Sequence, residues 1–221
     1  MELKMNVFLK NIPLFTGLHE PELAVLSSDG VRKPFPRNAL IIQQGAAGDA
    51  LFIVLSGKVK VFLTSEDGKE VTLSTLGPGD FVGEMALIDN EPRSAGVMTM
   101  EPSEFFILSR ADFRTALQSN ANLAINLMKG LCQRLRITDD KIGALALLDV
   151  YGRVARTLMQ LAKPRDGQYV VTERISQQEI ANMVGASREM VNRIFRDLTA
   201  AGHIRMEEGR IVVNQSAIAT H

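Results

Sequence analysis

The hydrophobic periodicity of this chain changes near residue 111, and that change limits the folds open to it. Between about residues 30 and 110, short runs rich in β-branched and aromatic residues, such as LFIVLSGKVKVFLT, alternate with turns that contain glycine and aspartate. Short strands at near-regular spacing are typical of a closed β sandwich or barrel. Beyond residue 111 the apolar residues recur with helical spacing. The sequence therefore predicts an α+β fold with a β domain, then a long helix, then a smaller domain.

The long helix is predicted between about residues 111 and 147. Its apolar residues recur at alternating steps of four and three, the heptad pattern that forms a coiled-coil seam. The heptad positions are Ala124, Met128, Leu131, Leu135, Thr138, Ile142 and Leu145. Thr138 is the polar member of this set. The pattern has two interpretations: the seam of a dimer, which we favour, or the packing face of a core helix in a monomer.

The C-terminal part, from about residue 149, has the pattern of a helix-turn-helix. Ser176 is followed three residues later by Glu179, the spacing of a capping box that begins a helix. Gly185 can supply a tight turn, and Ser187 can cap a second helix. Two helices joined by a short turn with glycine are typical of DNA-binding proteins. A β-hairpin is predicted to follow in HIRMEEGRIVV, with Glu208 and Gly209 at its tip.

On a wheel of about 100° per residue, the second helix divides into an apolar and a polar face. The apolar face contains Met190, Val191, Ile194, Phe195 and Leu198, and the polar face contains Arg188, Glu189, Asn192, Arg193 and Arg196. Arginine can donate two hydrogen bonds to guanine, and glutamate can accept one from cytosine. A merely solvated face would show the same pattern, but the cap, the turn and the hairpin favour DNA recognition. Residues 150–221 also carry a net charge of +3, against −3 for the rest.

The segment FVGEMALIDNEPRSA in the β domain predicts an anion-binding site. Gly83 allows the backbone to approach a ligand closely, and a helical turn after it would direct N–H groups at an anion. Arg93 and Ser94 can donate hydrogen bonds to a phosphate, whereas Glu84 can accept one from a sugar hydroxyl. This combination suits a ribose phosphate. An internal Glu84–Arg93 ion pair that closes a loop is the alternative.

Several classes of protein are excluded or disfavoured. A single cysteine, Cys132, excludes a disulfide framework within the chain and an all-cysteine metal site. The three histidines lack metal-ligand spacing, so no metal is expected. No apolar run approaches the roughly 20 residues that span a bilayer. No catalytic triad or Walker motif is present, so we do not expect an enzyme. The single cysteine fits a reducing, cytoplasmic compartment, and the lack of a long apolar run predicts no contact with a membrane.

Four motifs in collinear order resemble those of the cyclic AMP receptor protein (CRP/FNR) family of bacterial transcription regulators. They are QGAAGDALFIVLSGKV, FVGEMALIDNEPRSA, RLRITDDKIGALALLDVYGRVARTL and SREMVNRIFRDL. The resemblance covers about residues 15–213. It implies a jelly-roll-like β-roll that binds a cyclic nucleotide over residues 1–115, a dimerisation helix and hinge over 116–148, and a winged helix-turn-helix over 149–221.

The resemblance also implies site residues. Glu84 matches the partner of the ribose 2′-hydroxyl, Arg93 and Ser94 match the phosphate clamp, and Thr138 matches a seam threonine that contacts the adenine amino group. The implied ligand-binding residues are Gly83, Glu84, Met85, Ala86, Arg93, Ser94, Ala95, Thr138 and Asp139. The implied DNA-binding residues are Ser176, Gln178, Ser187, Arg188, Glu189, Asn192 and Arg193. A homodimer on palindromic TGTGA-like half-sites, with RNA polymerase as a further partner, follows from the same resemblance.

Asp139 is a departure from the family pattern, in which a serine follows the seam threonine. Its carboxylate can accept a hydrogen bond from the adenine amino group, or from guanine N1–H and its 2-amino group. Cyclic AMP is therefore the expected effector, with cyclic GMP, cyclic di-GMP or no nucleotide effector as alternatives. The segment AKPRDGQY is shorter than the family loop that contacts RNA polymerase, so the activation geometry stays open.

Overall fold

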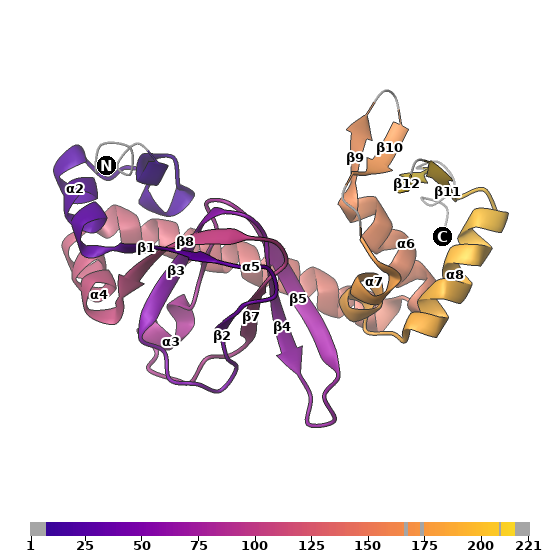
Figure 1. Ribbon diagram of the computed structural model, residues 1–221, viewed down its shortest axis with the longest axis horizontal. Helices are drawn as coiled ribbons and strands as arrows, with labels where there is room; N and C mark the ends of the chain where they lie inside the picture. The colour runs from indigo at the N-terminus through magenta and orange to yellow at the C-terminus, as the bar shows by residue number, and fades with distance from the viewer. Residues whose placement is uncertain (1–7, 166–167, 173–174, 208, 215–221) are drawn as a thin grey trace. The chain divides into compact units, whose positions relative to one another are not determined.

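The computed structural model describes residues 8–165, 168–172, 175–207 and 209–214 (Figure 1). The chain divides into two compact units, Met1–Arg136 and Ile137–His221, which are treated separately below. The predicted domain limits differ from this division, which falls inside a helix, and they stay predictions. The tip residue Glu208 of the predicted hairpin lies outside the described residues.

The first unit contains two four-stranded antiparallel sheets with short helices around them. The sheet orders are β1-β8-β3-β6 and β2-β7-β4-β5. The strands are β1 Val31–Phe35, β2 Leu40–Ile42, β3 Ala50–Ser56, β4 Val59–Thr64, β5 Glu70–Leu76, β6 Phe81–Val82, β7 Gly96–Thr99 and β8 Ser103–Ser109. The helices are η1 Pro13–Phe15, α2 Glu20–Asp29, α3 Glu84–Ile88, α4 Arg110–Ser119 and the first part of α5 Ala121–Leu147, which continues into the second unit. The predicted α+β class is confirmed.

Side chains of β3 alternate between the two faces of its sheet, and each face contributes to a separate hydrophobic core. Successive side chains of a strand point to opposite faces, so Leu51 and Ile53 pack with the helices, whereas Val54 packs with the second sheet. Phe106 and Phe105 of β8 divide in the same way. Both faces of the first sheet are therefore buried, which explains why LFIVL reads as a continuous apolar run.

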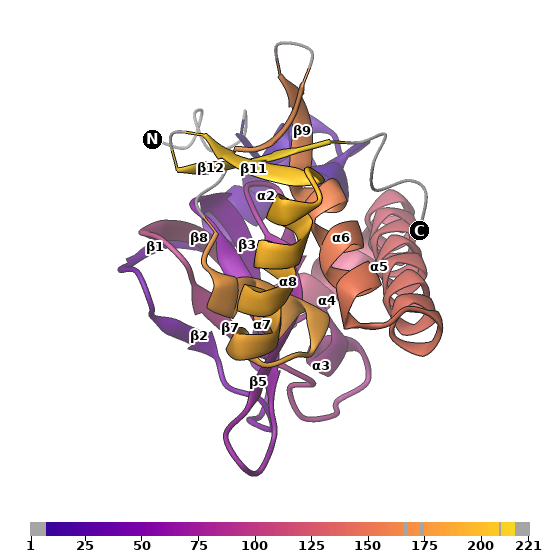
Figure 2. The ribbon, with the colours of Figure 1, turned by 90° about the vertical axis from the view of Figure 1, so that its right-hand side faces the viewer.

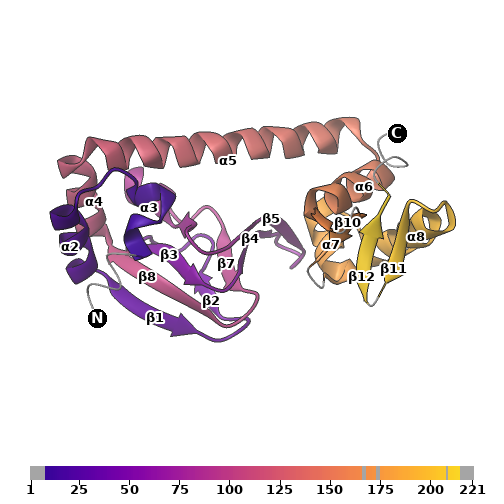
Figure 3. The ribbon, with the colours of Figure 1, turned by 90° about the horizontal axis from the view of Figure 1, so that it is seen from above.

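The predicted helix over residues 111–147 forms as two helices. Asn120 interrupts it in an extended conformation, and its side-chain oxygen accepts a hydrogen bond from the Leu123 N–H at 3.1 Å. Asn120 therefore acts as the cap that begins α5, which Figure 3 shows as one continuous helix. Leu123 and Leu127 of α5 are buried against the first unit.

The heptad positions further along α5 are exposed in the single chain. Leu135 is 61% exposed, and Ile142 is 59% exposed. Met128 and Leu145 are each 56% exposed. A face of this kind is costly to leave in water, because apolar burial contributes roughly 25 cal/mol per Å². These four side chains are not covered by the described residues of the single chain, whereas the heptad residue Leu131 packs against the core of the first unit.

The second unit is a small sheet against three helices. The sheet order is β11-β12-β10-β9. The elements are α6 Val150–Leu161, β9 Ala162–Arg165, β10 Gln168–Val171, α7 Gln177–Val184, α8 Arg188–Ala200, β11 Ile204–Glu207 and β12 Arg210–Val213. Its core includes Val154, Leu158, Ile180, Val191 and Leu198. Figure 2 shows the hairpin β11–β12 next to α8.

Candidate functional site

The first candidate site centres on Arg93, a buried arginine in the β domain that is 5% exposed. Its guanidinium donates hydrogen bonds to the carbonyls of Gly83 at 2.6 Å and Ala50 at 2.7 Å. Asp49, whose side chain is 94% exposed, lies 3.7 Å away. Burial lowers the pKa of Arg93, and the negative charges of Asp49 and Glu84 oppose this shift. The site therefore holds a buried cation that forms its ion pair with a solvent-exposed carboxylate.

Gly83 is required by the shape of this site. It adopts φ +88° immediately before α3, a conformation that L side chains rarely adopt. A Cβ atom there would lie 2.3 Å from Nη1 of Arg93. A Cβ atom on Gly48 would lie 2.6 Å from the Cβ of Ala86. Both glycines thus allow backbone to pack directly against the arginine and the short helix.

Glu84 is the first residue of α3 and is 3% exposed. Its Oε1 accepts a hydrogen bond from Arg134 of α5 at 2.8 Å. The Arg134 guanidinium also donates to the carbonyl of Phe81 and lies 4.4 Å from the centre of the Phe81 ring. The ion pair of Glu84 is therefore formed with Arg134, and the alternative of a Glu84–Arg93 pair closing the loop is not what the structure contains.

The second carboxylate oxygen of Glu84, Oε2, is buried and has no hydrogen-bond partner among the described residues. A buried polar atom without a partner is uncommon and costly. It marks a place where a donor from outside the chain would be stabilising. Sequence reasoning identified Glu84 but missed Arg134, which lies one helical turn before Thr138 on the same helix face.

The remaining predicted pocket residues differ in exposure. Ala86 and Ala95 are buried, whereas Met85 is 48% exposed. The exposed Ser94 hydroxyl donates to the Met85 sulfur at 3.6 Å, a weak contact that a better acceptor could replace. Thr138 and Asp139 are exposed on α5, four and five residues beyond Arg134. The ligand-contacting roles of all these residues stay predictions.

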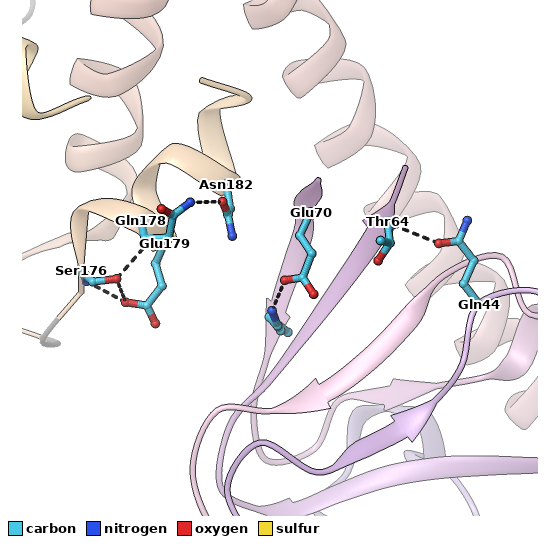
Figure 4. A network of polar contacts seen from close by, with 8 residues as sticks. Gln44, Thr64, Glu70, Ser176, Gln178, Glu179 and Asn182 are labelled. Carbon is cyan, nitrogen blue, oxygen red and sulfur yellow. Dashed lines mark hydrogen bonds and ion pairs between the residues drawn. The ribbon is translucent and has the colours of Figure 1, made fainter. Parts of the chain in front are cut away.

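The second candidate site is the pair of helices α7 and α8. Ser176 and Glu179 form the predicted capping box: the Glu179 N–H donates to Ser176 Oγ at 3.2 Å, and the Ser176 N–H donates to Glu179 Oε2 at 2.6 Å (Figure 4). Gly185 ends α7 in the left-handed conformation, at φ 65°. Ser187 caps α8 by accepting from the Met190 N–H at 3.2 Å. The predicted helix-turn-helix is confirmed.

The two faces of α8 also follow the prediction. Val191, Ile194 and Leu198 are buried in the core of the second unit. The polar residues Arg188, Glu189, Asn192, Arg193 and Arg196 are all exposed. Hydrogen bonds from its own N–H and from Ser187 lower the pKa of Glu189, so its carboxylate is charged near neutral pH. The face therefore presents fork-shaped donors and one acceptor to solvent.

The surroundings of this face include the predicted hairpin. β11 and β12 pair in antiparallel register from Ile204↔Val213 to Glu207↔Arg210. A groove of about 520 Å³ lies between α8 and the hairpin, with Asn192, Arg196 and Met206 among its lining residues. Gln178 of α7 donates to Asn182 at 2.8 Å (Figure 4). The base-contacting and phosphate-contacting roles of these residues remain untested predictions.

A two-sheet β domain with a buried arginine, followed by a winged helix-turn-helix, is the architecture of a DNA-binding transcription regulator with a ligand-binding domain. Residues 32–120 match the cyclic nucleotide-binding domain family, and residues 152–217 match the Crp-like helix-turn-helix domain family. The chain belongs to the CRP/FNR family of transcription regulators. The resemblance seen in the four motifs is thereby confirmed, and the family consists of regulators, not enzymes.

Two relatives cover nearly the whole chain. The CRP-like cAMP-activated global transcriptional regulator of Mycobacterium tuberculosis is 33% identical over 96% of each chain. The cyclic AMP receptor protein of Thermus thermophilus is 35% identical over 95% of this chain and 96% of its own. Among solved structures, the c-di-GMP responsive regulator CLP of Xanthomonas campestris has a TM-score of 0.77 at 29% identity, covering 88% of this chain and 99% of its own.

The described residues contain no helix with both the length and the apolar character to cross a membrane. They contain no cluster of three or more histidine, cysteine or acidic side chains suited to hold a metal ion.

Proposed function

We propose that this protein is a homodimeric regulator whose affinity for palindromic DNA is controlled by cyclic AMP. The observation that carries the effector proposal is the unpartnered, buried Oε2 of Glu84 in a site with two arginines, Arg93 and Arg134. A bare inorganic anion would be repelled by this carboxylate. A ribose phosphate offers an anion to the arginine and a hydroxyl donor to the carboxylate, so it satisfies both.

The residues of this site offer partners of the right chemical type for such a ligand. Arg93 hydrogen-bonds to two backbone carbonyls, and a phosphate would offer its guanidinium a stronger, charge-assisted partner. Ser94 would donate its hydroxyl to the same phosphate. Glu84 Oε2 would accept from the ribose 2′-hydroxyl, while Oε1 keeps its hydrogen bond from Arg134.

Calorimetric titration of the purified protein with cyclic AMP, cyclic GMP and cyclic di-GMP tests the effector. We expect cyclic AMP to bind and Arg93→Ala to abolish that binding with the fold retained. Arg114→Ala, an exposed arginine on α4, is the matched control and should bind normally. If none of the three nucleotides binds the wild type, the effector proposal fails while the DNA proposal stands.

A guanine nucleotide is the second candidate effector. Asp139 supports it, since a carboxylate can accept from both guanine N1–H and the 2-amino group. The similarity to a regulator described as c-di-GMP responsive supports it as well. The variant Asp139→Ser discriminates between the two effectors. If the carboxylate only repels the phosphate-bearing ligand, the variant should bind cyclic AMP more tightly than the wild type. If the carboxylate recognises the base, the variant should bind guanine nucleotides more weakly.

For DNA, we propose that a dimer along the α5 heptad presents two copies of α8 to successive major grooves, about 34 Å apart. Arg188, Glu189 and Arg193 would read base edges in half-sites similar to TGTGA, with Asn192 beside them. Ser176, Gln178 and Ser187 would contact phosphates. A gel shift with a TGTGA palindrome, compared with a duplex in which one half-site is scrambled, tests this arrangement.

Coupling between the two sites follows from linkage. A nucleotide that binds the DNA-competent arrangement more tightly shifts the population towards it, and operator DNA must then tighten nucleotide binding by the same factor. Titrating nucleotide in the presence and absence of operator measures this factor directly. RNA polymerase as a partner and the cytoplasm as location belong to the same proposal.

A further inference from the structure

The side chain of Arg110, the first residue of α4, joins two segments that also hold Arg93. Its Nη2 donates to the carbonyl of Ala86 in α3 at 3.1 Å and to the carbonyl of Gly48. Its Nη1 donates to the side-chain oxygen of Asn90 at 2.6 Å. Its backbone N–H donates to the carbonyl of Asp49 at 2.7 Å. One residue thus links the loop before β3 to the short helix after β6.

The Gly48 loop and the segment that contains α3 lie on opposite sides of the Arg93 side chain. The guanidinium donates one hydrogen bond to each side, to the carbonyl of Ala50 after the Gly48 loop and to the carbonyl of Gly83 before α3. Between the segments there is no spare room, because a Cβ on Gly48 would lie 2.6 Å from the Cβ of Ala86 and 3.1 Å from Cζ of Arg93. Because Arg93 is hydrogen-bonded to both sides, movement of α3 away from the Gly48 loop would break one of these hydrogen bonds.

Arg110 also anchors a strained turn. Asn90 follows α3 and adopts φ +63°, a left-handed conformation that asparagine tolerates better than most residues but still at a cost. The hydrogen bond from Arg110 to the Asn90 side chain stabilises this turn, and Arg93 follows three residues later. The path of the chain from α3 to the anion-binding arginine is thus fixed by a residue outside that segment.

The charge of Arg110 adds an electrostatic effect. Its hydrogen bonds end on carbonyl and amide oxygens, and within the described part of the chain no carboxylate forms an ion pair with it. Its positive charge repels that of Arg93, which contributes to lowering the pKa of Arg93. An anion bound at Arg93 would relieve this repulsion, so both charges favour it.

We propose that Arg110 is a positioning residue of the anion site, which fixes Arg93 through the two segments and raises the affinity for a phosphate by its charge. This inference rests on the proposed nucleotide function, because the phosphate in question is that of the bound nucleotide. It concerns a residue that would not touch the ligand.

The test uses full-length Arg110→Met, which removes the charge and the hydrogen bonds, and Arg110→Lys, which keeps the charge alone. Arg114→Met is the matched control, because it removes one positive charge from the exposed side of the same helix. Cyclic AMP affinity is measured by calorimetry at several salt concentrations. Hydrogen exchange of the 83–94 segment is measured in the protein without nucleotide.

We expect Arg110→Met to weaken cyclic AMP binding by about tenfold or more, since a hydrogen bond to a charged group contributes enough for such a change. Its affinity should also depend less on salt, because one unscreened charge is gone. Arg110→Lys should retain the salt dependence with intermediate affinity, and Arg114→Met should stay within about twofold of wild type by the same reasoning. Exchange in 83–94 should accelerate in Arg110→Met alone.

Two results would overturn the inference. One is cyclic AMP binding by Arg110→Met within about twofold of wild type. The other is weaker binding with unchanged salt dependence and unchanged exchange in 83–94, which would assign the loss to general destabilisation. Failure of the wild type to bind any cyclic nucleotide would refute the proposed function instead, and the exchange measurement would still decide whether Arg110 positions the segment.

Discussion

Replacing Arg134 should lower the stability of the first unit and leave that of the second unit unchanged. Its guanidinium forms the ion pair of Glu84, whose side chain is 4% exposed, while the Arg134 side chain is 33% exposed. Removing one partner of a buried pair costs roughly 3–5 kcal/mol. Because a third of the Arg134 side chain is in contact with water, solvent offsets part of this cost, and we expect about 2–3 kcal/mol for Arg134→Met. Methionine keeps an apolar chain over Phe81, so the loss of stability reports on the removal of the positive charge and its hydrogen bonds.

The assay follows from the distribution of aromatic residues. The chain has no tryptophan, and its two tyrosines, Tyr151 and Tyr169, both belong to the second unit. Tyrosine fluorescence during urea unfolding therefore reports on the second unit and serves as an internal control. Hydrogen exchange of residues 81–88 at increasing urea reports on the first unit. Arg134→Met should lower the stability in the exchange data and leave the tyrosine transition in place.

A second variant tests why Arg134→Met loses stability. If the cost arises from an uncompensated carboxylate, Glu84→Gln in the Arg134→Met background should recover about half of the lost stability or more, since the amide carries no charge. A change below about 0.5 kcal/mol in Arg134→Met, the range of ordinary surface substitutions, would refute the reasoning. So would a double variant as unstable as the single one.

Four further predictions concern other parts of the chain. Gly83→Ala should weaken nucleotide binding about tenfold or more, because the new Cβ would lie 2.3 Å from Nη1 of Arg93; Gly45→Ala has a similar positive φ but open space around it, and calorimetry should show normal binding. Arg188→Ala should cost about 1–3 kcal/mol at one base pair of the operator; an equal loss on every sequence in competition gel shifts would indicate a phosphate contact. Leu135→Glu should shift the protein towards monomer in sedimentation velocity, whereas the exposed Gln133→Glu should not. Ser187→Ala removes the α8 cap and should lower the stability seen by tyrosine fluorescence by about 1 kcal/mol; an unchanged transition would show that the cap is dispensable.

The helix-turn-helix could be predicted closely from the sequence because its signals are local. The cap at Ser176, the turn at Gly185 and the faces of α8 each depend on residues within a few positions of one another. The break at Asn120 is also encoded locally, in an asparagine able to cap the next helix. It was overlooked because apolar residues continue at helical spacing on both sides of it.

The contacts around Glu84 and Arg93 could not be predicted in the same way. Glu84 and Arg134 are separated by 50 positions, and Arg110 and Gly48 by 62. No periodic pattern relates residues at such distances, so the sequence supplies the chemical types and only the fold brings them together. This explains why Glu84 and Arg93 were identified from the sequence whereas Arg134 and Arg110 were not.

The position of Arg134 connects the two halves of the proposed mechanism. It contacts Glu84 from α5, the same helix that carries the exposed heptad face, and it lies one turn before Thr138. A hydroxyl that donates to Oε2 of Glu84 would give this carboxylate a second hydrogen bond while Arg134 occupies the first. Since a ligand shifts an equilibrium only through contacts that differ between states, the ligand must favour arrangements of α5 in which Arg134 keeps its hold on Glu84. The Glu84 carboxylate would therefore connect the sugar of a bound nucleotide, through Arg134, to the helix on which a dimer would form.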